Sequence, residues 1–551
     1  MESDSCHARR THSFDSPLLS QQQQEPYYPS QPKKWHTKIF SKLQKWRKRH
    51  PLLNLLPALI LTLCIISISP PEGLTKTSMN LLGVFVGAIF AIITSGYRIS
   101  IIASITVCIL VLSNNLMCKT TDGKNVDCHL CGTQIVSADV NLNKKDIYMC
   151  IPITSAFDAA MSGFSSGIAW LIFSAFQIGK AIQITKLGHR VSLVILYHMG
   201  NSLLGLGYAI CVIELVLSAF IPSNSARGGG IIFPIITSII ESIEMSEFEM
   251  QPVYQYINLV GAYANTATSS IFLTSMAGNP LLALKAKEIF GIDFNFSAWF
   301  IGCFFVGFVV LLTIPIFSML YFKPQFEIQQ LKHRISSERY DLGKITSKEL
   351  KLCAVLFVCI ILWAGSPIFK ISAPIVAFLA TVALMLFDVL EWNDILSNTS
   401  AWDTFFWLAI FYTLANQLSL LGISSFIGKV LSNLLSSLSP FMSMIILSII
   451  YYYSTYLFSS TTSHIVALSG PFMEAAKFLK VNPLVFTAIL GLFSSLAAVL
   501  APYCCGCIAI YASLPYIKPN DWFKAGIFFS IVQILIVFGI GIPFYYLIGW
   551  L

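Results

Sequence analysis

The amino-acid sequence predicts an all-α polytopic membrane protein with about 11 transmembrane helices plus two re-entrant hairpins, arranged as an inverted internal repeat. Hydrophobic residues make up 55% of the 551 residues and charged residues only 11%, whereas about a quarter of the residues of a soluble domain are charged. Apolar stretches long enough to cross a bilayer recur along the chain. Two polar motifs interrupt such stretches at matching positions of a repeat.

The apolar stretches are separated by short polar loops. The first 50 residues contain four glutamines in a row and almost no apolar run, which predicts a disordered basic N-terminus. At ~20 residues per span, the candidate spans cover 52–70, 79–95, 99–117, 168–185, 257–277, 298–322, 353–369, 372–389, 404–420, 483–501 and 523–548. One membrane domain over 51–551 follows, with a first repeat near 79–322, including a cysteine-containing loop at 118–150, and a second near 353–548.

Two further apolar stretches, 202–240 and 440–478, are too long for one span and predict re-entrant hairpins. Segments 188–201 and 422–438 precede them and suit helices that lie along the membrane interface. Near the middle of the two stretches stand Pro222-Ser223-Asn224-Ser225-Ala226-Arg227-Gly228 and Ser460-Thr461-Thr462-Ser463-His464. Polar groups at membrane depth are tolerated only where they line a cavity or are buried in protein, so the two breaks predict a solute site.

The two motifs occupy equivalent places in a long internal repeat. Ser223 and Ser460 are 460 − 223 = 237 positions apart, and Arg227 and His464 are 464 − 227 = 237 positions apart. Repeats of this length are typical of secondary transporters, whose sites form from broken helices at the repeat interface. The membrane domain is therefore predicted to be a transporter domain.

Positive charge gathers in the loops. Eight lysines and arginines crowd residues 33–49, which places the N-terminus in the cytoplasm by the positive-inside rule. Carrying the spans forward puts the basic segment 323–351 on the same side and the loop 118–150 outside. These clusters indicate topology and contacts with lipid headgroups, not nucleic acid. We expect an integral multi-pass protein, first of a bacterial inner membrane, with a plastid inner envelope or vacuolar membrane as alternatives.

Four cysteines, Cys118, Cys128, Cys131 and Cys150, lie in the predicted outer loop. In an oxidising compartment they allow three disulfide pairings, and the sequence does not choose among them. A zinc site at Cys128-His129-Leu130-Cys131 is the alternative, but no second pair has matching spacing. Cys504, Cys505 and Cys507 follow the tenth span and are expected to pack as small residues, not to hold a metal.

The polar motifs suit an anion with two carboxylates. A carboxylate that leaves water must be given hydrogen-bond donors and positive charge. Ser, Asn and Thr side chains at the tips donate hydrogen bonds, and the helix after each break presents free N–H groups. Gly228, Gly229 and Gly230 allow the backbone and a ligand to approach closely.

Arg227 and His464 follow the tips and can both be cationic beside a dianion. Such fixed cations could replace the sodium of symporters, and a carrier built this way would be hard to move empty, which predicts obligatory exchange. A structural ion pair for Arg227 and an ordinary packed histidine for His464 are the alternatives.

Four motifs resemble signatures of the divalent anion/sodium symporter family, in its branch of 2-oxoglutarate/malate translocators and citrate/succinate exchangers. They are the run Pro222–Gly229, Leu273-Thr274-Ser275-Met276-Ala277-Gly278-Asn279-Pro280, Ala401-Trp402-Asp403-Thr404 and Tyr456–His464. The resemblance covers about 52–551 and implies an elevator-type motion and a homodimer. With the repeat it assigns substrate binding to Ser223, Asn224, Ser225, Arg227, Gly278, Asn279, Pro280, Ser460, Thr461, Thr462 and His464.

The sequence departs from the family pattern at three places. Ser225 stands where Thr is usual, and Thr461 stands where the sodium-coupled branch has Asn. The triplet Ser397-Asn398-Thr399 matches the family tip but lies outside the repeat register, so we interpret it as a decoy. The segment Pro502-Tyr503-Cys504-Cys505-Gly506-Cys507 replaces a segment that is richer in Gly, Ser and Thr in relatives, which leaves the substrate preference open.

These observations predict a secondary antiporter that exchanges dicarboxylates such as malate, 2-oxoglutarate, succinate or fumarate, with citrate as a further candidate. The alternatives are a sodium-coupled di- or tricarboxylate symporter and an anion channel. No cofactor or metal is expected, apart from sodium in the symporter alternative. An enzyme is disfavoured because the sequence has no phosphate loop, no nucleophile elbow and no paired His and Asp spacing.

Overall fold

A computed structural model describes residues 51–132, 150–241, 247–324, 329–514 and 517–551. The chain divides into two compact units, Met1–Asn54 and Leu55–Leu551. The predicted disorder of residues 1–50 lies outside the described residues. In the described part of the second unit the only sheet is the two-stranded β1 (Met117–Lys119) and β2 (Asn125–Asp127), and helices form nearly all the rest. The predicted all-α class is confirmed.

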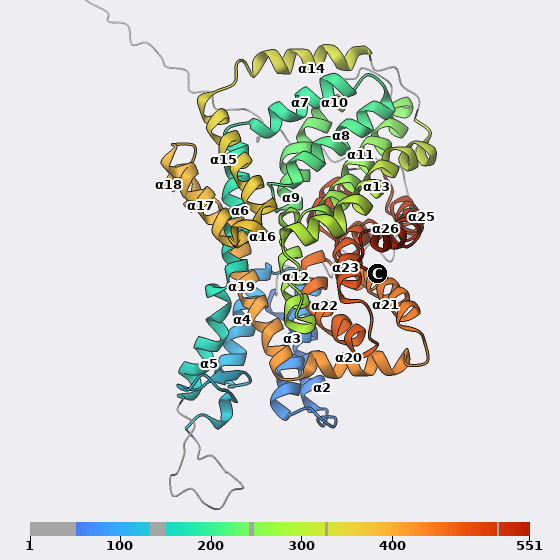
Figure 1. Cartoon of the computed structure of the whole chain (residues 1–551). Helices are drawn as coiled ribbons and strands as arrows, with labels where there is room; N and C mark the ends of the chain where they lie inside the picture. The colour runs from blue at the N-terminus through green and yellow to red at the C-terminus, as the bar shows by residue number, and fades with distance from the viewer. Residues whose placement is uncertain (1–50, 133–149, 242–246, 325–328, 515–516) are drawn as a thin grey trace, which may run out of the picture. The chain divides into compact units, whose positions relative to one another are not determined.

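The first half of the chain runs through the blue to green elements of Figure 1. Its helices are α2 (Leu56–Ser67), α3 (Lys76–Thr94), α4 (Ile99–Leu112), α5 (Pro152–Met161), α6 (Gly167–Ile184), α7 (Leu187–Met199), α8 (Leu203–Ser218), α9 (Asn224–Arg227), α10 (Phe233–Glu241), α11 (Glu247–Ile271), α12 (Asn279–Phe290) and α13 (Phe296–Phe322). Short turns are η3 (Cys128–Leu130), η4 (Ser162–Ser165), the π-helical η5 (Gly228–Ile232) and η6 (Leu273–Ser275).

The second half follows in yellow to red (Figure 1). Its helices are α14 (Gln329–Asp341), α15 (Ser347–Ala364), α16 (Ser366–Phe369), α17 (Ala373–Leu386), α18 (Trp392–Ser397), α19 (Thr399–Leu420), α20 (Ile423–Leu434), α21 (Pro440–Ser454), α22 (Thr461–Phe478), α23 (Pro483–Leu496), α24 (Gly506–Ala512), α25 (Pro519–Ile536) and α26 (Ile542–Leu547). Short turns are η7 (Thr455–Leu457), η8 (Ala497–Leu500) and the π-helical η9 (Val537–Gly541).

Local sequence signals explain where many helices begin. Proline stands in the first turn of α5, α12, α17, α21, α23 and α25, where its missing N–H would have had no helical partner. Thr75 with Ser78 and Thr346 with Glu349 form capping boxes at the starts of α3 and α15. The core gathers around α11 and α23, which pack against each other and against α13.

Six of the described helices, or seven if one bent pair counts as a span, are long and apolar enough to cross a membrane. Four shorter apolar helices add to them. Every predicted span overlaps a described helix, whereas the count of about 11 remains a prediction. The bent pair is α19 and α20, which turn by 64° at Gly422, whose φ is 75°, so α20 is a separate helix at the place predicted for an interface helix.

The internal repeat is visible in the helix starts. α8 begins at Leu203 and α21 at Pro440, and α9 begins at Asn224 and α22 at Thr461, each pair 237 positions apart (440 − 203 and 461 − 224). In Figure 1 α7, α8 and α10 lie in the upper half of the second unit, whereas α20, α21 and α22 lie in the lower half. The two hairpins therefore enter from opposite ends, as an inverted repeat requires.

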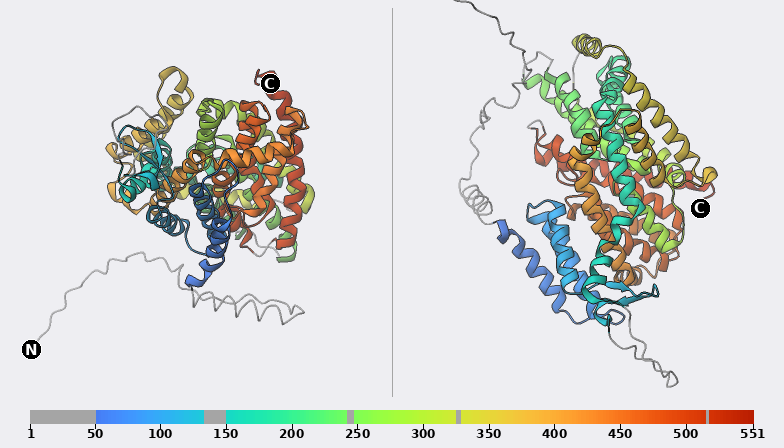
Figure 2. Two further views of the ribbon diagram at one scale, coloured as in Figure 1. Left: turned by 90° about the horizontal axis from the view of Figure 1, so that it is seen from below. Right: turned by 90° about the vertical axis from the view of Figure 1, so that its left-hand side faces the viewer.

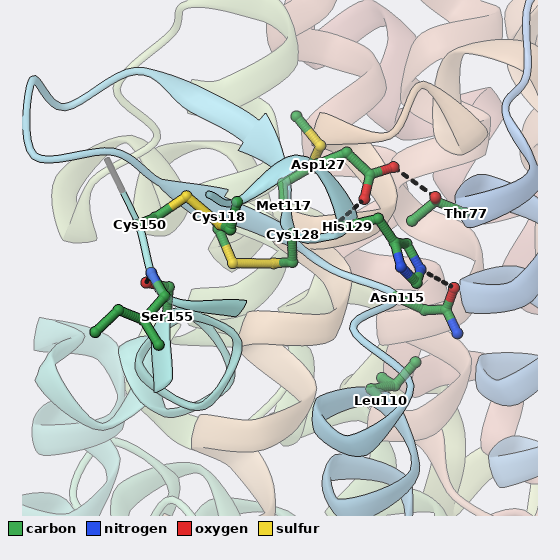
Figure 3. Close-up of a disulfide and its surroundings, with 12 residues drawn as sticks. Thr77, Leu110, Asn115, Met117, Cys118, Asp127, Cys128, His129, Cys150 and Ser155 are labelled. Atoms are coloured by element: carbon green, nitrogen blue, oxygen red, sulfur yellow. Dashed lines mark hydrogen bonds between the residues drawn. A yellow bond between two sulfur atoms is a disulfide. The ribbon is translucent and has the colours of Figure 1, made fainter. Parts of the chain in front are cut away.

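The structure shows the disulfide pairing of the four loop cysteines, which the sequence left open. Cys118 pairs with Cys128 and Cys131 pairs with Cys150, and residues 133–149 lie outside the described residues. The first bridge closes the β1–β2 hairpin, and Asp127 also accepts a hydrogen bond from Thr77 of α3 (Figure 3). The zinc alternative was wrong because these sulfurs are bonded to each other. This hairpin and α14 lie at opposite ends of the second unit (Figures 1 and 2).

Candidate solute-binding site

The first hairpin tip lies between α8 and α9. Ser223 caps α9, because its Oγ accepts a hydrogen bond of 3.1 Å from the backbone N–H of Ala226. Asn224 Oδ1 accepts a hydrogen bond of 2.9 Å from the N–H of Ser225. The side chains of Ser223, Asn224 and Ser225 are half-buried. Within the described residues neither Asn224 Nδ2 nor Ser225 Oγ donates to a protein group, so the tip offers donors to a ligand.

The glycines after this tip serve close packing. A Cβ on Gly228 would collide with Cys507 Sγ, and one on Gly229 would collide with Ile510 of α24. On the facing segment, a Cβ on Gly506 would lie 2.5 Å from Ser225 Oγ. The start of α24 therefore sits directly on the first tip. Cys507 of α24 is buried and packs as a small residue, as expected.

The second tip lies between η7 and α22. Ser460 caps α22, because its Oγ accepts a hydrogen bond of 3.4 Å from the N–H of Ser463. Thr461 and Thr462 are buried, with 3% and 9% of their surface exposed. Among the described residues the Thr461 hydroxyl has one hydrogen-bond partner, Met276 Sδ at 3.5 Å, and a thioether is a weak acceptor. That hydroxyl can turn toward a better acceptor.

The break between α11 and α12 packs against the second tip. A Cβ on Gly278 would collide with Ile465 of α22 and would lie 3.6 Å from Thr462 Cα. Asn279 holds the break in place, since its Nδ2 donates hydrogen bonds of 2.9 Å to the carbonyls of Ser269 and Phe272. The predicted residues of this break thus lie beside Thr462. Pro280, next in the chain, lines a separate cavity of about 540 Å³.

Arg227 does not present a free cation to a ligand. Its side chain is 0% exposed, and Nε lies 2.6 Å from Glu214 Oε2 of α8. The other N–H groups donate to the carbonyls of Ile221, Asn265 and Ser275 and to the hydroxyls of Thr268 and Ser269. The prediction that Arg227 lies open beside a dianion is therefore not what the structure shows. The guanidinium joins the first hairpin, α11 and the break after α11.

His464 is likewise turned away from the tip. Its Nε2 lies 2.8 Å from Ser454 Oγ, at the end of α21. The ring is 0% exposed and lies with its centroid 4.3 Å from that of Tyr451 and 5.1 Å from that of Phe458. The alternative of a packed histidine describes this arrangement better than a cation facing substrate.

Sequence reasoning missed Glu214 and Asn265. Glu214 accepts a hydrogen bond from Arg227. Asn265 Nδ2 donates hydrogen bonds of 3.0 Å to Glu214 Oε1 and of 3.1 Å to the carbonyl of Asn224. A signal for Glu214 existed, because it is the sole carboxylate in the apolar run 203–218 and a buried charge needs a partner of opposite sign. Asn265 carries no comparable signal, because Thr266, Thr268, Ser269 and Ser270 close to it are polar as well.

The decoy triplet lies apart from both tips. Asn398 caps α19, and its Nδ2 donates hydrogen bonds of 3.2 Å to the carbonyl of Phe176 and 3.1 Å to Gln177 Oε1 of α6. These contacts give Asn398 a structural role between α19 and α6.

Comparison with known proteins identifies the family of the chain. The family model described as the sodium:sulfate symporter transmembrane region matches residues 49–551, which is most of the chain. The chain belongs to the divalent anion/sodium symporter family. The symporter family consists of transporters, so the expectation that the chain is not an enzyme is confirmed. With the apolar helices, membership makes the chain an integral multi-pass membrane protein.

Individual relatives in the symporter family are bacterial. The L-tartrate/succinate antiporters of Escherichia coli (strain K12) and Shigella flexneri are each 33% identical over 382 residues, covering 69% of this chain and 78% of theirs. Their source agrees with the expected bacterial inner membrane. The crystal structure of the Alcanivorax borkumensis YdaH transporter gives a TM-score of 0.49 at 9% identity, covering 82% of this chain and 98% of that one.

Proposed function

We propose that the two hairpin tips bind a dicarboxylate and that the protein exchanges one dicarboxylate for another across the membrane. The observation that carries the proposal is the equivalent placement of two donor-rich helix starts, Ser223–Ser225 and Ser460–Thr462, in an inverted repeat. The relatives described as L-tartrate/succinate antiporters support a dicarboxylate as substrate and exchange as the mode of transport.

Each tip suits one carboxylate group. α22 is 18 residues long, and its N-terminus carries partial positive charge and free N–H groups that stabilise an anion. At the first tip Asn224 Nδ2 and Ser225 Oγ supply donors, and at the second the hydroxyl of Thr461 donates to a weak acceptor, Met276 Sδ. Gly278 and Asn279 shape the second tip and are proposed to bound the same site. Pro280 lines the separate cavity, so it is left out of the proposed dicarboxylate site.

Arg227 has a different proposed role from the one that the sequence suggested. It ties three segments by donating to oxygen atoms of Glu214, Ile221, Asn265, Thr268, Ser269 and Ser275. A bound metal cation would join segments in the same way, through their oxygen atoms. We propose that this built-in cation makes sodium unnecessary at the first tip. Since Glu214 balances its charge, Arg227 positions the tip and does not neutralise the substrate.

Sodium-coupled symport is the second candidate, and one observation favours it. The oxygens Asn265 Oδ1 and Asn279 Oδ1 are buried and accept no hydrogen bond from the described residues. Amide oxygens are ligands that hard cations take. A requirement for sodium would make these two oxygens the first candidates for its ligands.

We further propose an elevator-type motion in a homodimer, with lipid around the apolar helices. The support is the family resemblance together with the packing of α6 against α17 and α19, apart from the packing of α11 against α13 and α23. Helices α6, α17 and α19 would stay in place while α11, α13 and α23 move together with the two tips.

Counterflow in liposomes tests the proposed function. Liposomes that contain the protein and are loaded with unlabelled succinate should accumulate external labelled succinate or malate in sodium-free buffer, whereas empty liposomes should not. Equal uptake into empty liposomes without sodium would indicate a channel. Uptake into empty liposomes that requires sodium would instead establish the symporter and overturn exchange.

A further inference from the structure

A cavity of about 540 Å³ lies between α6, α12, the start of α13 and the α16–α17 turn. Its volume falls in the ~300–1,000 Å³ range of small-molecule sites. The wall is mainly apolar, and it includes Leu171, Leu273, Leu284, Phe294, Phe296 and Ile371. None of the donor residues of the two hairpin tips lines this cavity, so it is a separate space.

Charged and polar groups occur at few places in the cavity wall. Lys287 lies 3.3 Å from Asp293, and both side chains are about two-thirds exposed. Lys370 is exposed and forms no ion pair with the described carboxylates. The hydroxyl of Ser366 is buried and has no hydrogen-bond partner among the described residues. The cavity therefore combines an apolar wall with a lysine that has no described acidic partner and a buried hydroxyl that has no described hydrogen-bond partner. These features match an apolar ligand with an anionic headgroup.

The surface next to the cavity is apolar as well. Ile368, Phe369 and Ile375, which flank Lys370 along α16 and α17, are 81%, 49% and 54% exposed. Exposed apolar side chains in a membrane protein face lipid or a partner. The cavity thus borders a surface that acyl chains can reach, whereas a small dicarboxylate would gain little from its walls.

We propose that this cavity binds one acyl chain of an anionic phospholipid, with the headgroup at Lys370 and Ser366. The lipid would contact α12, which carries Asn279 and Pro280, on one side and α6 and α17 on the other. An occupant there would hold these helices in the arrangement that the structure shows. The proposal concerns binding and does not depend on which solute is transported.

Photolabelling in liposomes tests the proposal. The full chain is placed in phosphatidylcholine liposomes that contain a trace of phosphatidylglycerol with a diazirine on one acyl chain, and the labelled peptides are mapped. We expect labels in α12 and α17. Lys370→Gln should lower this labelling about fivefold, the effect of one lysine near an anionic headgroup. Ala283→Phe, which places an aromatic ring in the cavity, should lower it as well.

Lys323→Gln is the matched control. Lys323 and Lys370 both cap a helix end with left-handed backbone, at φ of 49° and 54°, so the two substitutions carry the same backbone cost. Lys323→Gln should leave labelling unchanged. Labelling that is insensitive to Lys370→Gln, or spread evenly over exposed α15 and α17, would overturn the proposal. So would loss of label on adding succinate, because the cavity would then be an entrance for substrate.

Discussion

Arg227 Nε lies 2.6 Å from Glu214 Oε2 in the first hairpin. The equivalent residues of the second hairpin, 451 − 214 = 464 − 227 = 237 positions further on, are Tyr451 and His464, whose ring centroids are 4.3 Å apart. The same two positions of the repeat therefore tie each tip helix to the first arm of its hairpin. One tie is an ion pair and the other is an aromatic contact.

The ion pair predicts how Arg227 variants behave. Arg227→Ala should destabilise the protein strongly, since removing one partner of a buried pair costs about 3–5 kcal/mol. Arg227→Lys should rescue it poorly, because an ammonium cannot reach all the acceptors of a planar guanidinium. Thermal unfolding in detergent measures both. The double variant Glu214→Met with Arg227→Met should regain stability yet transport poorly, and an Arg227→Ala variant as stable as the wild type would refute the pairing role.

The tip donors predict a different pattern. Asn224→Ala and Thr461→Ala should each reduce dicarboxylate counterflow by about tenfold or more while the protein stays folded, because a buried anion that loses a donor costs about 1–3 kcal/mol. The control is Asn398→Ala, which should cost about 1 kcal/mol of stability by removing a helix cap and leave the apparent affinity for substrate unchanged. An inactive Asn398→Ala beside a normal Asn224→Ala would place the site elsewhere.

The disulfides predict how the outer loop reacts with thiol reagents. In intact cells an impermeant maleimide should leave Cys118, Cys128, Cys131 and Cys150 unmodified until a reductant opens their bridges. After reduction, Cys131 and Cys150 should react from outside before Cys118 and Cys128, which are 0% exposed. Mass spectrometry of the peptides gives the order. Reaction that requires permeabilised cells would reverse the topology.

The ion pair between Arg190 and Glu349 predicts that the stability of the fold depends on pH. The two side chains lie 2.7 Å apart, and Arg190 joins α7 to the start of α15. Burial raises the pKa of Glu349, but hydrogen bonds from Arg190 and Thr346 outweigh it and hold the pKa below its ordinary value of 4.5. A lowered carboxylate pKa stabilises the fold above pH 4.5, and this contribution is lost as the pH falls through the lowered pKa.

Glu349→Gln should therefore lower the midpoint of thermal unfolding at pH 7. The difference from wild type should shrink as the pH is lowered below the ordinary pKa of a glutamate. The matched control is Glu391→Gln, a helix-capping glutamate at the start of α18 that has no basic partner in the described ion pairs. A difference between wild type and Glu349→Gln that grows toward acid would contradict the sign of the shift.

Much of the fold could be predicted because apolar length and polar breaks are local signals. The starts of α9 and α22 at Asn224 and Thr461 follow from Ser caps that the sequence displays. The partners of Arg227 could not be predicted in the same way, since Glu214 and Ser275 lie 13 and 48 positions away. The pairing of four cysteines also depends on distances that only the folded β1–β2 hairpin sets.

Protection of a cysteine at the first tip tests the central claim most directly. Ser225→Cys places a thiol at a half-buried tip position, and Ser397→Cys places one at the decoy. In the reconstituted protein, the reaction of the unsubstituted chain with a maleimide gives the background rate. Above this background, succinate should slow the reaction of Ser225→Cys, whereas propionate should not. Ser397→Cys should react at the same rate with or without succinate. Protection of Ser397→Cys, or an unprotected Ser225→Cys in protein that still exchanges succinate, would contradict the proposed site.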